Sequence, residues 1–185
     1  MDDRSSQTLE DQLPALYQAH RSGLTGAVRG ILGPSTETAE VLQESFLKAW
    51  NALRRGTRPQ DPLAWIFVIT LNLAKDHRRR RSRRRPSHPL EEVDPMQLRS
   101  SDSGPAAAAS QREALDAARR AIHSLQDKEK EVFLLRVSAG LTFEAIGDAL
   151  GIPVGTAKTR MRTALGRLRG ELTAFSPDRT GRDVQ

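Results

Sequence analysis

One stretch of the chain, Leu141 to Arg169, constrains the fold more than any other. Gly151 divides this stretch, because glycine readily adopts the left-handed conformation that ends a helix. Pro153 follows shortly after, and proline suits the first turn of a helix but not its interior. Beyond it, apolar residues recur at the period of one buried helical face. The stretch is therefore predicted to form two helices joined by a short turn, with Gly147 at their close approach.

The second of these predicted helices carries basic side chains away from its apolar face, and no acidic residue occurs from Val154 until Glu171. A short turn followed by a basic helix is typical of a helix-turn-helix, whose second helix enters the major groove of DNA. The alternative is an ordinary helical hairpin with a solvated basic face. DNA binding is the favoured interpretation. The side chains expected to reach base edges or phosphates are Thr156, Lys158, Thr159, Arg160, Arg162 and Arg167.

The 185-residue chain has a formal net charge of +6, and its charge is unevenly distributed. Residues 54–85 contain 11 Lys and Arg against two Asp and Glu, whereas residues 86–110 contain one against four. Basic segments of this kind favour a polyanionic partner. The lack of cysteine excludes disulfides and Cys-based zinc sites, and the four histidines show no metal-ligand spacing. We therefore expect neither a metal nor a cofactor.

Residues 9–85 and 111–175 are each expected to form a small all-helical domain, because apolar residues recur there at helical spacing and no segment alternates like a strand. Residues 86–110 contain four prolines and almost no large apolar side chains, so a flexible linker is expected there. Residues 176–185 are expected to be a disordered tail. No signal-peptide pattern opens the chain, and no apolar run approaches the roughly 20 residues of a membrane span. We therefore expect a cytoplasmic protein that does not insert into membranes.

Two predicted helices in the N-terminal domain carry polar or basic surfaces. The first, from Thr36 to Leu53, buries one apolar face and leaves a polar face that the residues alone assign to solvent. The second begins near Pro62, is apolar on both sides, and runs into seven arginines between Arg78 and Arg85. Such a run is commonly a solvated tail, but its continuity with a buried helix favours contact with phosphates.

Three segments carry a more specific signal through their order and separation: Ala39–Leu53, Pro62–Arg81 and Ser124–Arg169. The first reads AEVLQESFLKAWNAL, the second PLAWIFVITLNLAKDHRRRR, and the third contains the helix-turn-helix pattern. Together they resemble bacterial RNA polymerase sigma factors, most of all the compact extracytoplasmic-function group, also called group four. The resemblance implies sigma region two in the N-terminal domain and sigma region four in the C-terminal domain. It also implies a promoter-recognition subunit that is not an enzyme.

The resemblance further implies that the helix at Ala39–Leu53 binds core RNA polymerase, whose largest and second-largest subunits would be partners. The implied polymerase-binding residues are Glu40, Gln43, Glu44, Leu47 and Lys48. The loop and helix that follow would hold the opened minus-ten promoter strand, since a basic groove can bind single-stranded DNA and a flipped base. The implied minus-ten residues are Arg54, Arg55, Arg58, Trp65, Asn72, Lys75, Asp76, Arg78 and Arg79.

The helix-turn-helix of such a factor would bind the duplex minus-thirty-five element. The implied residues are Thr142, Thr156, Lys158, Thr159, Arg160, Arg162, Thr163 and Arg167. An anti-sigma factor that covers the polymerase-binding and DNA-binding faces is a further implied partner.

The residues also bear on two other classes of protein. A stand-alone helix-turn-helix regulator would bind palindromic DNA without polymerase, and it is the alternative to an initiation factor. An enzyme such as a recombinase would need a nucleophile with supporting arginines or a cluster of carboxylates. The acidic residues are dispersed along the chain and no serine or tyrosine lies in such a setting, which disfavours an enzyme.

Overall fold

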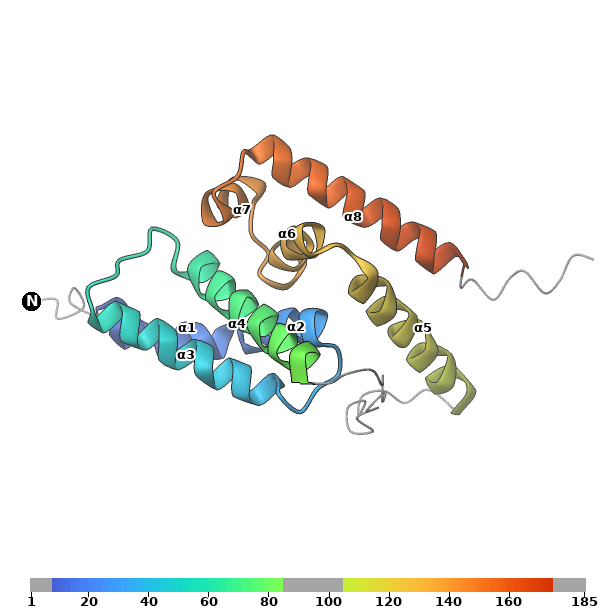
Figure 1. Ribbon diagram of the computed structural model, residues 1–185, viewed down its shortest axis with the longest axis horizontal. Coiled ribbons are helices and arrows are strands. Elements are labelled where there is room, and N and C mark those ends of the chain that lie inside the picture. Colours follow the sequence, from blue (N-terminus) through green and yellow to red (C-terminus); the bar gives the residue numbers. More distant parts are fainter. Residues whose placement is uncertain (1–7, 85–104, 175–185) are drawn as a thin grey trace, which may run out of the picture.

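The computed structural model describes residues 8–84 and 105–174, and every regular element within these ranges is an α-helix (Figure 1). This confirms the predicted all-helical fold. The tail predicted at 176–185 and most of the predicted linker lie outside the described residues. The helices of the described ranges are α1 (Leu9–Ala19), α2 (Arg21–Leu32), α3 (Thr38–Arg54), α4 (Pro62–Arg84), α5 (Pro105–Ser124), α6 (Asp127–Ser138), α7 (Phe143–Leu150) and α8 (Val154–Ala174).

The N-terminal half, α1 to α4, is built around α4, which packs against both α2 and α3. Phe67 and Leu71 of α4 are fully buried, as the apolar character of both sides of this helix predicts. The hydroxyl of Tyr17 in α1 donates a hydrogen bond of 2.7 Å to the carbonyl oxygen of Leu42 in α3. These contacts fix the orientation of α3 about its own axis, and so decide which of its side chains face outward.

Two helix starts differ from the prediction. α3 begins at Thr38 rather than Thr36, because the Ser35 hydroxyl accepts a hydrogen bond from the backbone N–H of Glu37 and closes a turn ahead of the helix. α5 begins at Pro105 and therefore extends into the range 86–110 that was expected to be a linker. Proline suits a first helical position and the alanine run after it has high helix propensity, which accounts for the earlier start.

The C-terminal half, α5 to α8, has its own apolar centre, in which α8 packs against α5, α6 and α7. Leu135 of α6, Ile146 of α7 and Ala164 of α8 are fully buried there. The guanidinium of Arg136 donates a hydrogen bond of 2.6 Å to the Leu141 carbonyl oxygen and so braces the connection between α6 and α7. The C-terminal half thus holds α7 and α8 in a fixed orientation relative to each other.

The two halves also pack against each other, mainly through α2 with α6 and α4 with α7, and their buried apolar residues form one continuous cluster. Glycines of α2 allow this approach. A Cβ atom added at Gly30 would lie 2.6 Å from a Leu134 methyl group, and one at Gly23 would overlap the Ser138 carbonyl oxygen. We call these α2–α6 and α4–α7 contacts, together with the ion pairs described below, the inter-half contact. The sequence predicted the halves but not this packing.

Candidate nucleic-acid and polymerase interface

The helix-turn-helix has the geometry that its sequence predicts. The Thr142 hydroxyl accepts a hydrogen bond of 3.1 Å from the backbone N–H of Ala145 and caps α7. Gly151 ends α7 in the left-handed conformation, with φ 62° and ψ 39°. The backbone N–H of Ile152 then bonds to the Gly147 carbonyl oxygen, and a Cβ atom at Gly147 would lie 2.9 Å from the Ile152 carbonyl oxygen. The close approach expected at Gly147 is therefore present.

The second helix of this motif, α8, buries a narrow apolar face and turns its other sides outward. Ala157 and Ala164 are fully buried against the other helices of this half. Among the residues predicted to contact minus-thirty-five DNA, Thr156 and Arg160 are half-buried and the rest are exposed. The exposed ones on α8 are Lys158, Thr159, Arg162, Thr163 and Arg167. The arrangement gives a cationic, hydroxyl-bearing surface of the kind that binds phosphates and base edges.

Arg167 is less free than the sequence suggests. Its guanidinium lies 3.3 Å from a carboxylate oxygen of Glu129, whose side chain is only 10% exposed. A phosphate at Arg167 would compete with this carboxylate. Because Glu129 lies on α6 and Arg167 on α8, this ion pair also joins α8 to α6.

The polar side chains predicted to bind polymerase lie on the outward side of α3. Val41, Ser45 and Ala49 are buried on the opposite side. The predicted residues that the structure leaves exposed are Glu40, Gln43, Leu47 and Lys48. Leu47 is 50% exposed, which is unusual for a large apolar side chain here. The fifth, Glu44, is half-buried and forms a contact with α4 through His77. An exposed leucine ringed by polar groups is a feature that protein interfaces share.

The arginines predicted in the loop after α3 do not act alike. Arg54 and Arg55 are exposed, whereas the Arg58 guanidinium donates hydrogen bonds of 2.9 Å to the carbonyl oxygens of Leu53 and Thr57. Arg58 therefore holds the loop in shape. On α4, Trp65 is half-buried and Asn72 is exposed, while Asp76 and Arg79 form an ion pair of 3.6 Å.

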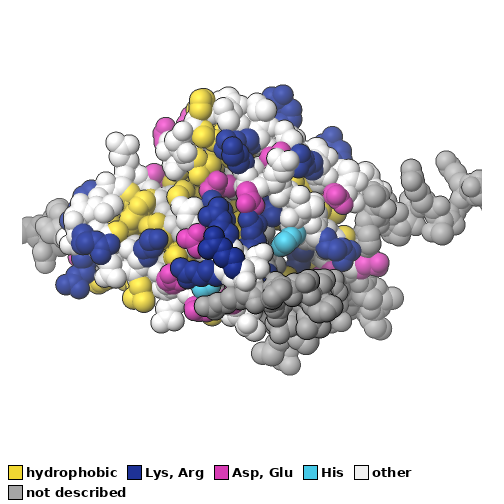
Figure 2. Space-filling model, in the orientation of Figure 1, with side chains coloured by type: hydrophobic (Ala, Val, Ile, Leu, Met, Phe, Trp, Pro, Cys, Tyr) yellow, Lys and Arg dark blue, Asp and Glu magenta, His cyan; other side chains and the backbone are white. Residues whose placement is uncertain are grey.

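Two cations predicted to hold minus-ten DNA join the two halves in this structure. Lys75 Nζ donates a hydrogen bond of 2.7 Å to Glu131 of α6. Arg78 donates to both carboxylate oxygens of Asp127, over 2.8 and 2.6 Å. The hydrogen bond from Arg78 holds the pKa of Asp127 below its ordinary value. Figure 2 shows basic and acidic side chains lying together over the middle of this face, near the place where α4 meets α6 in Figure 1.

Lys130 is a buried residue that sequence reasoning missed. Only 1% of it is exposed, its Nζ donates a hydrogen bond of 2.8 Å to the His123 carbonyl oxygen, and burial lowers its pKa. It lies in a charged segment, KEKE, where nothing in the local pattern marks one lysine as internal. Its role is to connect α6 to the end of α5.

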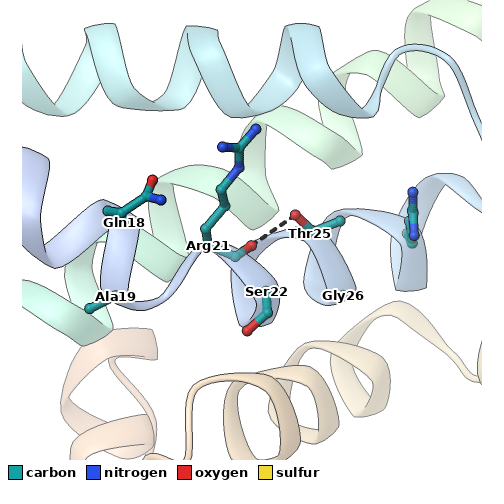
Figure 3. Close-up of a pocket in the computed structure, with 7 residues that line it drawn as sticks. Gln18, Ala19, Arg21, Ser22, Thr25 and Gly26 are labelled. Carbon is teal, nitrogen blue, oxygen red and sulfur yellow. Dashed lines mark hydrogen bonds between the residues drawn. The ribbon is translucent and has the colours of Figure 1, made fainter. Parts of the chain in front are cut away.

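An open hollow lies where α1 meets α2 (Figure 3). Gln18, Arg21 and Thr25 line it. The Thr25 hydroxyl donates its hydrogen to the Arg21 carbonyl oxygen at 2.8 Å, as the dashed line shows. None of the residues predicted to bind polymerase or DNA lines this hollow. In the described parts of the chain, no trio of His, Cys, Asp or Glu side chains is placed to hold a metal ion. None of the described helices has the length and apolarity to cross a bilayer.

A polar face with an exposed leucine on α3, a cationic α4 and a capped helix-turn-helix in one chain are typical of a DNA-binding transcription factor. The family described as Sigma-70 region 2 matches residues 16–84, and the family described as Sigma-70, region 4 matches residues 121–170. The chain therefore belongs to the sigma-70 family. Relatives described as ECF sigma factors place it in the extracytoplasmic-function group. This confirms the resemblance found in the sequence.

Individual relatives agree with this assignment. The RNA polymerase sigma factor NccH of Alcaligenes xylosoxydans xylosoxydans is 27% identical over 160 residues, which cover 86% of this chain and 84% of NccH. The ECF RNA polymerase sigma-E factor of Salmonella typhimurium is 29% identical over 69% of this chain and 70% of its own. Among solved structures, the sigma factor RpoE of Bartonella quintana, crystallised with the anti-sigma factor NepR, has a similar fold. Its TM-score is 0.65 at 20% identity, over 89% of this chain and 96% of that one.

Proposed function

We propose that this sigma factor binds core RNA polymerase through α3, holds minus-ten DNA with α4 and its preceding loop, and reads minus-thirty-five DNA with α8. The observation that carries the proposal is the outward placement of these surfaces on separate helices of one chain. The exposed Leu47 lies among polar residues on α3, while the exposed Lys158 and Arg162 lie on α8 behind a correctly capped turn. The chemistry of RNA synthesis stays with the polymerase, so the proposal gives this chain no catalytic step. It places the chain in the cytoplasm with its polymerase.

The inter-half contact adds a condition to this function. The carboxylates of Glu131 and Asp127 would compete with DNA phosphates for Lys75 and Arg78. Promoter DNA would therefore bind these two side chains best once α6 has moved away from α4. Core polymerase would favour the separated form by binding both halves, and an anti-sigma factor would favour a form in which these surfaces are covered. The solved complex of RpoE with NepR supports an anti-sigma partner of this kind.

Run-off transcription with core polymerase tests the proposal. The template is the region upstream of the chain's own gene, and transcripts of a defined start are expected only when the chain is added. The double variant Gln43→Ala, Glu44→Ala should lose transcription and co-elution with core polymerase. It should keep its helical circular dichroism spectrum, because neither side chain belongs to the core. Specific binding of duplex DNA without polymerase, and no polymerase binding, would favour the stand-alone regulator.

A further inference from the structure

His77 is a buried histidine placed between two glutamates. It lies on α4 and is 9% exposed. Its Nε2 atom is 2.9 Å from a carboxylate oxygen of Glu44, and its Nδ1 atom is 3.9 Å from a carboxylate oxygen of Glu37. That Glu37 oxygen is itself buried and has no hydrogen-bond partner among the described residues. Because an ionised carboxylate only accepts hydrogen bonds, Nε2 is the nitrogen that donates to Glu44.

The contact joins two surfaces that the proposed function uses. Glu44 lies on α3 beside the exposed Glu40 and Gln43, in the row of residues proposed to meet polymerase. His77 directly precedes Arg78, in the part of α4 proposed to meet DNA. The Glu44 side chain remains 42% exposed, so one oxygen can be held by His77 while the group is still open to a partner.

We propose that His77 is a positioning residue, which holds the Glu44 carboxylate in the orientation that core polymerase receives. The inference rests on the proposed function of α3. A glutamate on a helix surface normally samples several rotamers and loses that freedom on binding. The hydrogen bond from a buried ring removes part of this freedom in advance. Loss of the ring should therefore weaken polymerase binding about threefold to tenfold, the range expected for one newly immobilised side chain.

A double-mutant cycle on the full chain tests this assignment. The Kd for core polymerase is measured for the wild type, His77→Phe, Glu44→Ala and the pair. His77→Phe should weaken binding when Glu44 is present and have no further effect when Glu44 is alanine. Gln43→Ala is the matched background, because Gln43 is exposed and does not contact His77 in the structure. In the Gln43→Ala background, His77→Phe should weaken polymerase binding by the same factor as it does in the wild type.

His77→Gln serves as a second variant, because its side-chain amide can also donate to Glu44, and it should recover part of the affinity. Urea unfolding of each variant reports any general loss of fold. An equal loss from His77→Phe in the wild-type and Glu44→Ala backgrounds would show that the ring only supports the helices, and would overturn the proposal. An unchanged Kd for core polymerase after His77→Phe in the wild-type background would also overturn the proposal. A wild-type chain that fails to bind core polymerase would instead refute the proposed function of α3.

Discussion

The guanidinium of Arg78 on α4 donates two hydrogen bonds to the carboxylate of Asp127, at the first residue of α6. The two residues belong to different sigma regions, so the contact spans the halves of the molecule. One turn earlier on α4, Lys75 makes the corresponding bond to Glu131. In the proposed function, the acidic side chains of α6 would thus compete with DNA phosphates for these two cations.

Removing these carboxylates should loosen the inter-half contact. The double variant Asp127→Asn, Glu131→Gln takes away the charge and keeps the shape, and ion pairs near a protein surface contribute up to about 1 kcal/mol each. The chain has no cysteine, so fluorophores can be attached at Ala15→Cys and Gly170→Cys, which are exposed positions in α1 and α8. At low salt, energy transfer between the two labels should be lower in the double variant than in the wild type. In the wild type, energy transfer should fall only when the salt concentration is raised.

The matched control for that measurement is Asp116→Asn, because Asp116 pairs with Arg119 on its own helix and not with the other half. The control should behave as the wild type. Equal energy transfer in the wild type and the double variant at every salt concentration would show that apolar packing alone holds the halves together.

The Arg78–Asp127 pair should also make stability depend on pH. The folded pKa of Asp127 is lowered, first because Arg78 donates to its carboxylate. A lowered carboxyl pKa stabilises the folded state above the ordinary value of 3.8, and this contribution is lost as pH falls below that value towards the folded pKa. The difference in free energy of unfolding between the wild type and Asp127→Asn should therefore shrink on acidification. A difference that stayed constant from about pH 6 to pH 3 would contradict this, since linkage requires a change.

Two glycines of α2 give a test of the apolar part of the contact. Gly23→Ala should destabilise the chain by about 1–3 kcal/mol, because its methyl group would overlap the Ser138 carbonyl oxygen. Gly26→Ala is the control on the same helix, since its methyl group would come no closer than 3.7 Å to Ser138 Oγ. Alanine there should stabilise the helix by about 0.5–1 kcal/mol. Urea unfolding measures both, and a similar result for the two variants would mean that α2 and α6 are not packed this closely.

Arg162 on α8 is exposed and faces away from the buried alanines, so it should contact promoter DNA. Arg162→Ala is expected to weaken minus-thirty-five binding by the polymerase complex by about 1–3 kcal/mol and to relax the preference at one base pair. Competition binding with single-base variants of the promoter measures this. Arg119→Ala, in α5, is the control and should leave the preference unchanged. A uniform loss across all promoter variants would assign Arg162 to a phosphate instead.

The sequence predicted features that depend on neighbouring residues. Gly151 and Pro153 mark the turn between α7 and α8 because their backbone preferences act locally. The outward and inward sides of α3 and α8 follow from helical periodicity. The polymerase-binding and DNA-binding side chains could be proposed from the family resemblance alone, because the motifs that carry it are short local segments.

What the sequence did not reveal depends on contacts between distant residues. Nothing near Lys75 indicates Glu131 as its partner, and nothing near Lys130 distinguishes it from the exposed Lys128. The glycines of α2 look like weak points of a helix, and only the position of α6 shows that they allow close packing. His77 was similarly unmarked, because Glu44 lies on another helix and Glu37 lies in the turn before that helix.

The central claim is that promoter recognition by this chain requires core polymerase, which separates α6 from α4. The direct measurement is binding of a labelled promoter fragment by the chain alone and by the chain with core polymerase, at the same salt concentration. The account predicts sequence-specific binding, with protection of both promoter elements, only in the presence of core polymerase. Equal affinity and the same protected bases for the free chain would contradict it.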